Sequence, residues 1–287
     1  KAGYPVAGFD MYVTSTVLPG SGLSSSAACE VLIGTTGNHL FCQDKFDAVE
    51  IAKIGQAAEN EYFGKPCGLM DQTASSVGDA VAIDFKDPAN PIVRSINADL
   101  TGLGLALCII DCGADHAALT NEYASIPEEM SKVAAHFGKK VLREVQEEDL
   151  LADLAQVRKE AGDRAVLRAL HFYADDRRAA EEADALERKD KEAFLNLVKE
   201  SGRSSWELLQ NITPAAAITH QDMAVALAEK ALNGKGACRV HGGGFAGTIQ
   251  AFVPVENVCE FKKTMETMLS EGCCHVLSIR PAGGLIL

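Results

Sequence analysis

The sequence predicts an α+β fold, and three observations support this prediction. The chain has 287 residues, and at roughly 100–200 residues per domain this length suits one large domain or two small ones. Apolar runs typical of short strands occur at 103–111, 238–240, 248–253 and 275–279. The segment 116–232, between the first and second of these runs, has a helical and acidic pattern. We therefore expect a four-stranded sheet with helices packed against it.

The first hundred residues predict a further set of short elements. These are a strand or strand pair over 7–17, helices from residue 27, over 45–62 and over 70–77, and a strand over 80–85. The loop 87–91 contains two prolines and is a candidate domain boundary. We place the N-terminal domain at 1–100 and the C-terminal domain at 101–287.

The later part of the chain predicts helices interrupted by helix-breaking residues. The expected breaks are Pro127, Gly138, Gly162, Gly202 and Pro214. A further helix fits 258–269. We find no internal repeat and no low-complexity tract.

The charge of the chain limits the classes of partner. It has 27 Lys and Arg against 40 Asp and Glu, a formal net charge of −13. Contacts with the phosphates of a nucleic acid or of an anionic membrane need clustered basic residues. We therefore expect that the protein is not a general nucleic-acid binder and does not bind anionic membrane surfaces. A small anionic ligand stays open, since backbone N–H groups can hold a phosphate without net positive charge.

The cysteines and the hydropathy pattern predict a cytoplasmic protein. The nine cysteines form no CxxC pair, so we expect reduced thiols used as small apolar residues. The most apolar run, 102–110, is too short to cross a bilayer, and we expect no signal peptide. No HExxH or similar spacing occurs, which argues against a zinc site made by protein ligands alone.

The segment 19–28 is the strongest local signal for chemistry. Glycines and serines precede a helical stretch of small residues; the segment includes Gly20, Ser21, Gly22, Leu23, Ser24, Ser25 and Ser26. Glycines let the backbone approach an anion, and the helix start presents unpaired N–H groups and the positive end of the helix dipole. The alternative is a serine-rich helix cap. It is not a Walker A loop, because no Gly-Lys-Ser/Thr follows.

A second signal surrounds Asp71. A helix ends near Glu59, a Pro/Gly turn follows, and Asp71 stands at or near the start of the next helix. Asp71 is either a helix cap or a carboxylate held on a rigid turn to accept a proton. Glu59 is either a surface residue or a ligand that shares a metal ion with the serine loop.

A third signal is a glycine-rich stretch at 239–247. Gly242, Gly244 and Gly247 match the dinucleotide-binding pattern G-x-G-x-x-G. We reject that interpretation, because the pattern must open a helix and the segment 248–253 predicts a strand. We expect instead a glycine-rich hairpin whose glycines allow close approach to another loop or to a ligand.

In this order the three motifs resemble those of the GHMP small-molecule kinases, and more closely those of the galactokinases within that family. The segment 67–72, Cys-Gly-Leu-Met-Asp-Gln, is similar to the galactokinase signature, and Asn121-Glu122-Tyr123 falls where that group carries Ser-Glu-Tyr. The resemblance covers essentially the whole chain. It implies a two-domain fold, with a ribosomal-protein-S5-like N-terminal domain and a ferredoxin-like C-terminal domain.

The resemblance also implies roles for individual residues. The backbone of Gly20 to Ser26 would hold the nucleotide phosphates, and Ser26 and Glu59 would coordinate Mg²⁺. Asp71 would orient or deprotonate the C1 hydroxyl of the sugar. Gly68 and Tyr123 would contact the sugar, and Gly242, Gly243 and Gly244 would form the loop of the third motif.

The sequence departs from the family pattern in several places. The first motif, with its Gly-Glu-His-Thr-Asp stretch, does not occur in these residues, so we expect much of the sugar pocket to be missing from the chain as given. The basic residues usual after the tyrosine are replaced by Ile126-Pro127-Glu128-Glu129, Asp115 precedes His116 where a basic residue is common, and His241 and Ala246 replace a usual Thr and Gly. These changes bear on substrate choice and leave the serine loop and Asp71 intact.

The function implied is ATP-dependent phosphorylation of galactose at the C1 hydroxyl, with ATP and Mg²⁺ as the bound species. The alternatives are a GHMP kinase for another small sugar or alcohol, a non-catalytic sensor of sugar and nucleotide that binds partner proteins, and a purely structural fragment. We expect a monomer or weak homodimer.

Overall fold

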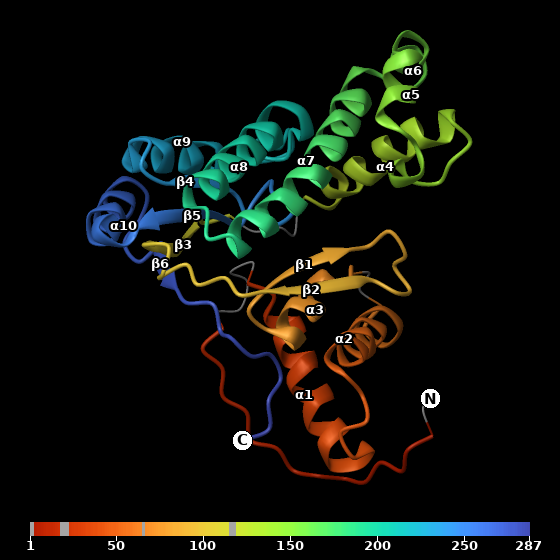
Figure 1. Ribbon diagram of the computed structural model, residues 1–287, viewed down its shortest axis with the longest axis vertical. Helices are drawn as coiled ribbons and strands as arrows, with labels where there is room; N and C mark the ends of the chain where they lie inside the picture. The colour runs from red at the N-terminus through yellow and green to blue at the C-terminus, as the bar shows by residue number, and fades with distance from the viewer. Residues whose placement is uncertain (1–2, 18–22, 65–66, 115–118) are drawn as a thin grey trace. The chain divides into compact units, whose positions relative to one another are not determined.

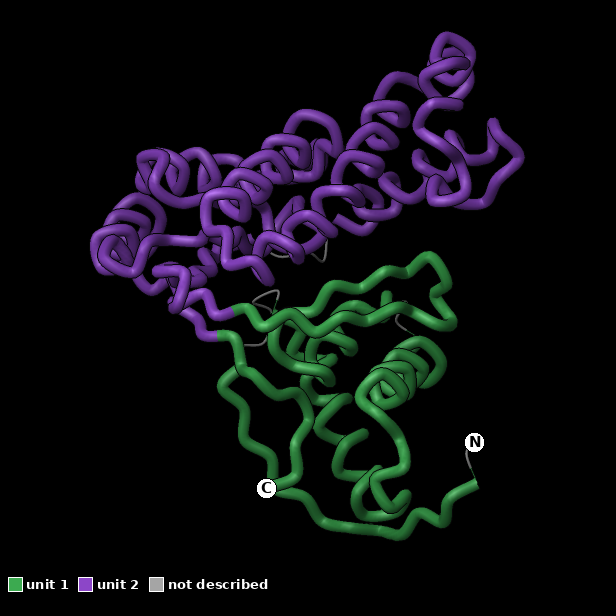
Figure 2. The backbone as a smooth tube through the Cα atoms, viewed as in Figure 1, with its two compact units in different colours: residues 1–98, 279–287 green, residues 99–278 purple. Residues whose placement is uncertain are grey.

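The computed structural model describes residues 3–17, 23–64, 67–114 and 119–287. The chain divides into two compact units, one of residues 1–98 with 279–287 and the other of residues 99–278 (Figure 2). We call them unit 1 and unit 2. The N- and C-terminal domains at 1–100 and 101–287 stay a prediction.

Unit 1 consists of helices and one hairpin (Figure 1). Its elements are α1 (Ser25–Cys42), α2 (Ala48–Ala57), the π-helix η1 (Ala58–Tyr62), α3 (Met70–Val77), β1 (Ala80–Asp84) and β2 (Ile92–Ile96). The strands are antiparallel and pair Ala80 with Ile96. A capping box starts α2, because the Asp47 and Glu50 side chains each accept from the other residue's backbone N–H at 2.8 Å. The predicted helices over 45–62 and 70–77 are confirmed.

Close packing of the helices in unit 1 depends on small residues. A Cβ on Gly34 would lie 3.0 Å from Ile51 Cγ2, and one on Gly55 would lie 3.2 Å from Glu30 Cβ. Residues 279–287 run beside α3, where Asp79 N donates to Arg280 O at 2.7 Å and Gly284 N donates to Ser76 O at 3.3 Å. The C-terminal end of the chain therefore belongs to the same unit as α3.

Two predictions for unit 1 are wrong. The segment 7–17 contains no strand, and Tyr12 is 92% exposed. The apolar residues of this segment alternate, but neither of its faces is buried. No described strand pairs with it, so the alternation does not produce a strand. The loop 87–91 is not a domain boundary but the turn of the β1–β2 hairpin, where Asp87 accepts N–H bonds from Ala89 and Asn90.

Unit 2 is built on the predicted four-stranded sheet, which is confirmed. Its strands are β3 (Leu105–Asp111), β4 (Ala237–Val240), β5 (Thr248–Pro254) and β6 (Cys274–Leu277). They are antiparallel in the order β4-β5-β3-β6, with Ile110 opposite Ile249 and Cys108 opposite Val276. Because β3 is paired on both sides, a nearly continuous apolar run suits it.

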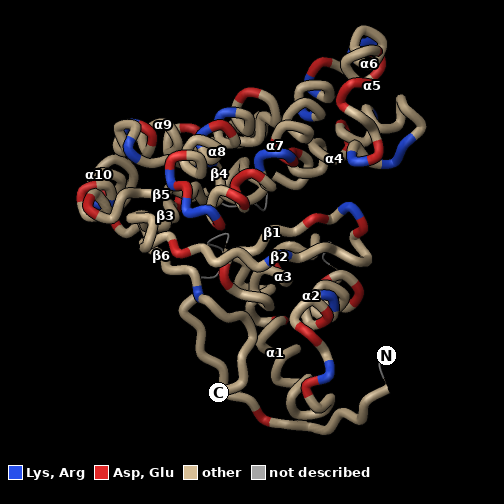
Figure 3. Tube along the Cα trace, in the orientation of Figure 1, with Lys and Arg blue, Asp and Glu red and all other residues tan. Residues whose placement is uncertain are grey.

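The remaining residues of unit 2 are mainly helical. The elements are α4 (Thr120–His136), η2 (Leu142–Glu144), α5 (Glu147–Ala152), α6 (Leu154–Ala161), α7 (Asp163–Glu187), α8 (Lys191–Ser204), η3 (Ser205–Leu209), α9 (Gln221–Leu232), η4 (Val255–Asn257) and α10 (Val258–Met268). One apolar cluster joins the sheet to α9 and α10, and another joins α4, α6 and α7. Acidic and basic residues are interspersed along these helices (Figure 3), as in the ion pairs Arg143–Asp176 and Arg177–Glu147.

Two predicted helix breaks in unit 2 are wrong. Pro127 lies inside α4 and Gly202 inside α8. Proline removes one helical hydrogen bond, yet α4 packs on both sides of it, through Tyr123 and Ile126 before Pro127 and through Val133 and Ala134 after it. Gly202 is needed for packing, since a Cβ there would lie 3.0 Å from Cys238 O in β4.

Five of the nine cysteines are buried like small apolar residues, as the sequence predicts, whereas Cys29 and Cys259 are exposed. All nine are free thiols. Cys108, Cys112, Cys238, Cys273 and Cys274 are buried in the apolar cluster of the sheet. Within the described residues, no helix has the length and apolar character needed to span a bilayer.

Candidate functional site

Among the described residues, no side chain caps the first turn of α1. Ser24 occupies the N-cap position with φ 55° and ψ 48°, and its hydroxyl makes no capping bond. The serine-rich cap considered from sequence is therefore not formed at Ser24. The first turn contains no acidic residue, and the first helical bond runs from Ala28 N to Ser24 O. The amide groups of this turn that precede Ala28 find no acceptor in the described part of the chain, and together with the dipole of an 18-residue helix they suit an anion.

The sequence-predicted phosphate loop is described only in part. Gly20, Ser21 and Gly22 lie outside the described residues. Leu23, Ser24 and Ser25 are half-buried, and Ser26 is exposed. Ser24 is one of the few non-glycine residues in the left-handed region, which for a serine is a strained conformation.

Asp71 lies in the first turn of α3. The N-cap residue is Leu69, so Asp71 is the second helical residue and the helix-cap interpretation is wrong. The Asp71 side chain is exposed, and no described residue forms a hydrogen bond or ion pair with it. A carboxylate in this position is stabilised by the helix dipole and stays accessible to a ligand.

Gln72, the next residue, is buried and joins three elements. Its Nε2 donates to Glu59 Oε2 at 3.1 Å and to Glu30 Oε2 at 3.0 Å. It is 1% exposed, and Glu59 is 4% exposed. Because the two carboxylates come from η1 and α1, the amide ties both elements to α3. The residue beside Asp71 is thus held rigidly.

The Glu59 carboxylate is a fitting ligand for a hard cation such as Mg²⁺. Mg²⁺ prefers oxygen ligands and takes only one or two carboxylates from a protein, with water and phosphate oxygens filling the other positions. Glu59 supplies one such carboxylate, and Ser26 an exposed hydroxyl. The described residues contain no group of three or more His, Cys, Asp and Glu that would hold a metal by themselves.

The turn before α3 is fixed by side chains of the preceding helices. Cys67 N donates to Asn60 Oδ1 at 2.7 Å, and Cys67 O accepts from Gln56 Nε2 at 3.1 Å. Burial and the neighbouring Glu59 raise the pKa of the Cys67 thiol to about 11. The thiol is therefore protonated near neutral pH and is a poor nucleophile. Gly68 is exposed, and a Cβ there would meet nothing within 4 Å.

The glycine-rich stretch connects β4 to β5, so the rejection of a dinucleotide-binding motif is confirmed. We call residues 241–247 the third-motif loop. Gly242 and Gly244 have φ of 62° and 82°, and Phe245 has φ of 61° although it is a bulky residue. The expected close approach is present, because a Cβ on Gly244 would lie 2.1 Å from Asn211 O.

Tyr123, from α4, packs against this loop. Its hydroxyl donates to Gly244 O at 2.5 Å, and its ring meets Phe245 edge-on at 5.4 Å between centroids. A Cβ on Gly243 would lie 3.0 Å from Tyr123 Cε1. Burial raises the pKa of Tyr123 to about 12, which keeps the hydroxyl a donor at neutral pH.

The structure adds two residues that sequence reasoning did not single out. Glu30 lies four residues after Ser26 on α1, and this spacing could have placed both on one helix face. Asn211 contacts the third-motif loop from 32 residues away in sequence, and no local pattern marks it.

Comparison with known proteins shows which families this chain resembles. Residues 1–79 match the family model described as the GHMP kinases N terminal domain. A galactokinase of Glaesserella parasuis is 34% identical over 264 residues, which are 90% of this chain and 65% of that protein. The chain is therefore similar to galactokinases, and its first 79 residues resemble a GHMP kinase N-terminal domain. A galactokinase of Actinobacillus pleuropneumoniae serotype 3 is 35% identical over 88% of this chain and 63% of its own length. The chain thus spans 65% and 63% of these two galactokinases.

Solved structures confirm the fold predicted from the GHMP kinase motifs. The structure of Lactococcus lactis galactokinase complexed with galactose gives a TM-score of 0.71 at 23% identity, covering 93% of this chain and 68% of that one. The structure of L. major mevalonate kinase in complex with R-mevalonate gives a lower TM-score of 0.55 at 12% identity, covering 91% of this chain and 66% of that one. At these identities the likeness is one of fold.

Proposed function

We propose that this galactokinase-like protein transfers the γ-phosphoryl group of ATP to the C1 hydroxyl of galactose, giving ADP and galactose 1-phosphate. The observation that carries the proposal is the exposed Asp71 carboxylate in the first turn of α3, with no partner among the described residues. Its neighbour Gln72 is buried and bonded to Glu59 and Glu30, so Asp71 is presented on a fixed backbone. The similarity to galactokinases supports galactose as the acceptor.

In the proposed reaction Asp71 accepts the proton of the sugar hydroxyl. The hydroxyl oxygen forms a bond to the γ-phosphorus, and the bond between that phosphorus and the bridging oxygen of ADP breaks. Such transfer depends mostly on positioning and on neutralising the charge of the phosphoryl oxygens. A general base contributes on the order of 10²–10⁴-fold.

The other roles follow the same proposal. The backbone from Gly20 to Ser26, leading into the uncapped first turn of α1, would hold the nucleotide phosphates. Ser26 and Glu59 would hold Mg²⁺, which supplies positive charge against the phosphates. Gly68 and Tyr123 would contact the sugar. A cytoplasmic location and a monomeric or weakly dimeric state stay predictions.

The test is ADP release by the full-length protein with Mg-ATP and galactose, beside a panel of sugars that includes N-acetylhexosamines. We expect selective turnover with galactose. The Asp71→Asn variant should lose about 10²–10⁴-fold in kcat while keeping nucleotide affinity. The matched control is Asp149→Asn, the same change at an exposed position in the first turn of α5, which should leave kcat unchanged.

Three results would contradict the proposal. Turnover only with another sugar would show that the protein is a kinase whose substrate is not galactose. Binding of ATP and galactose without turnover would favour a sensor. Full activity of Asp71→Asn would remove Asp71 from the role of base.

A further inference from the structure

The third-motif loop has a backbone that needs support from outside. Phe245 is 1% exposed and has φ 61°, a region that bulky residues rarely occupy. Such a conformation persists only where the surrounding structure holds it. Gly244, with φ 82°, precedes it, so two consecutive residues of the loop are left-handed.

Asn211 provides this support through both its backbone and its side chain. Its carbonyl oxygen accepts from Phe245 N at 2.5 Å, and its Nδ2 donates to Gly243 O at 3.1 Å. Asn211 is 1% exposed, so both bonds are shielded from water. Its Oδ1 has no hydrogen-bond partner among the described residues, so the amide is oriented by the Gly243 carbonyl alone.

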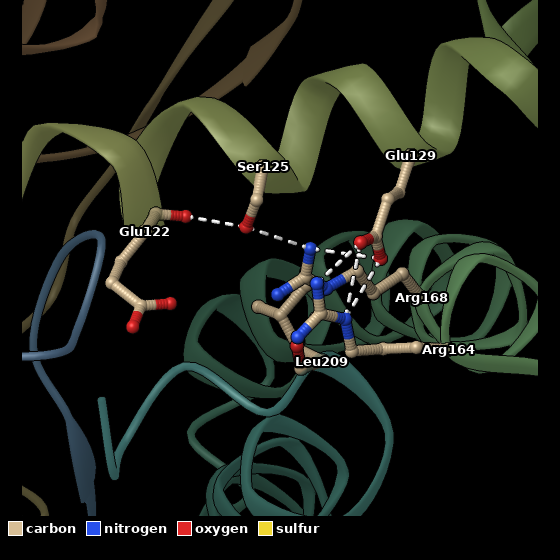
Figure 4. Close-up of polar contacts among 6 residues, drawn as sticks. All are labelled: Glu122, Ser125, Glu129, Arg164, Arg168 and Leu209. Carbon is tan, nitrogen blue, oxygen red and sulfur yellow. Dashed lines mark hydrogen bonds and ion pairs between the residues drawn. The ribbon is translucent and has the colours of Figure 1, made fainter. Parts of the chain in front are cut away.

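The backbone around Asn211 is in turn held by α4 and α7. Arg168, fully buried on α7, donates from Nε to Leu209 O at 3.1 Å and from Nη1 to Glu129 Oε2 and Ser125 Oγ at 3.0 Å each (Figure 4). After Asn211, Ala215 N donates to Glu122 Oε1 at 2.8 Å. Ser125, Glu129 and Glu122 all lie on α4, which thus anchors the chain on both sides of Asn211.

Tyr123 belongs to the same arrangement. It lies on α4 beside Glu122, and its hydroxyl donates to Gly244 O. The loop is therefore hydrogen-bonded to Asn211 through Gly243 O and Phe245 N, and to Tyr123 through Gly244 O. A shift of the loop away from Asn211 would remove the acceptor and the aromatic neighbour that orient the Tyr123 ring.

We propose that Asn211 is a positioning residue that holds the third-motif loop in its left-handed conformation and thereby orients Tyr123 for the sugar. The statement that Tyr123 contacts a sugar rests on the proposed function. The contacts between Asn211 and the third-motif loop do not depend on that function. Asn211 acts through Gly243 and Phe245.

The experiment compares Asn211→Asp with Asn211→Ser and with Asn233→Asp in the full-length protein. Aspartate keeps the shape of asparagine but turns an oxygen toward Gly243 O, whereas serine removes the amide without adding charge. Asn233, an exposed residue that also has positive φ at the end of α9, is the matched control. The readouts are hydrogen exchange of residues 241–248, the melting temperature, and KM for galactose and for ATP.

We expect Asn211→Asp to speed exchange of the Phe245 amide by about tenfold, the effect of losing one buried hydrogen bond. KM for galactose should rise by about tenfold while KM for ATP changes by less than twofold. Asn211→Ser should show smaller changes of the same kind, and Asn233→Asp none. Unchanged loop exchange in both Asn211 variants, or faster exchange throughout unit 2, would overturn the inference.

The two proposals fail in distinguishable ways. A wild-type protein that does not turn over galactose would overturn the proposed function, and loop exchange in the Asn211 variants would still test the positioning role. Galactose turnover with equal rises in both KM values would keep the function and contradict the role of Asn211 toward Tyr123.

Discussion

Gln72 Nε2 lies 3.1 Å from Glu59 Oε2, so the residue that follows the proposed base is bonded to the proposed metal ligand. Both side chains are almost fully buried. The same amide nitrogen also donates to Glu30. A single side chain therefore fixes the relative positions of η1, α1 and the first turn of α3.

The Gln72→Glu substitution tests this bridge. It preserves shape but replaces a donor by an acceptor between two carboxylates, so we expect a loss of about 3 kcal/mol in the free energy of unfolding. Urea denaturation measures it. Gln156→Glu is the matched control, since Gln156 also donates to a glutamate, Glu160, but at an exposed site. Equal losses of unfolding free energy in the two variants would show that the buried hydrogen bonds of Gln72 stabilise the protein no more than an exposed one does.

Glycine at 244 is required by both conformation and space. Gly244→Ala would place a Cβ 2.1 Å from Asn211 O at φ 82°, so the third-motif loop must move. Gly242→Ala has the same kind of strain, with φ 62°, but nothing within 4 Å. We expect Gly242→Ala to cost about 1 kcal/mol and Gly244→Ala at least twice that. If the denaturation curves of the two variants coincide, the close approach of Gly244 to Asn211 is refuted.

The buried pair of Glu129 and Arg168 predicts a large effect on stability. Arg168 is 1% exposed, and Glu129→Gln would remove the carboxylate with which it forms an ion pair. Breaking such a pair costs about 3–5 kcal/mol. Arg158→Gln, which breaks an exposed pair with Asp163, should leave the melting temperature nearly unchanged. A similar loss in both variants would contradict the assignment of Arg168 as a buried charge.

The same pair gives a pH dependence of defined sign. Burial alone would raise the pKa of Glu129, but the hydrogen bonds from Arg164 and the charge of Arg168 lower it overall. The folded pKa is below the unfolded one, so the stabilisation is complete above the unfolded pKa of about 4.3 and is lost as pH falls through the folded value. Melting temperatures from pH 7 to pH 3 should fall more steeply for wild type than for Glu129→Gln. Parallel curves would contradict the shift.

Local patterns in the sequence predicted many elements of the fold. The helix at 70–77, the loop before β2 and the four strands of unit 2 follow from apolar periodicity and from proline and glycine positions. The prediction failed where a local signal depends on a distant partner. Residues 7–17 alternate like a strand but pair with no described strand, and Gly202 breaks no helix because β4 packs against it.

The sequence by itself determined the ordered motifs and the family resemblance, because glycines, serines and the run around Asp71 are read from neighbouring positions. Only the tertiary structure showed that Gln72 bonds to Glu30 across 42 residues of sequence, and that Asn211 holds Gly243 across 32. Such contacts leave no periodic signal, since a hydrogen bond between distant segments depends on where the packed helices and sheet bring the two atoms. The motifs therefore indicate the type of reaction, and long-range packing determines the positions of supporting side chains such as Gln72 and Asn211.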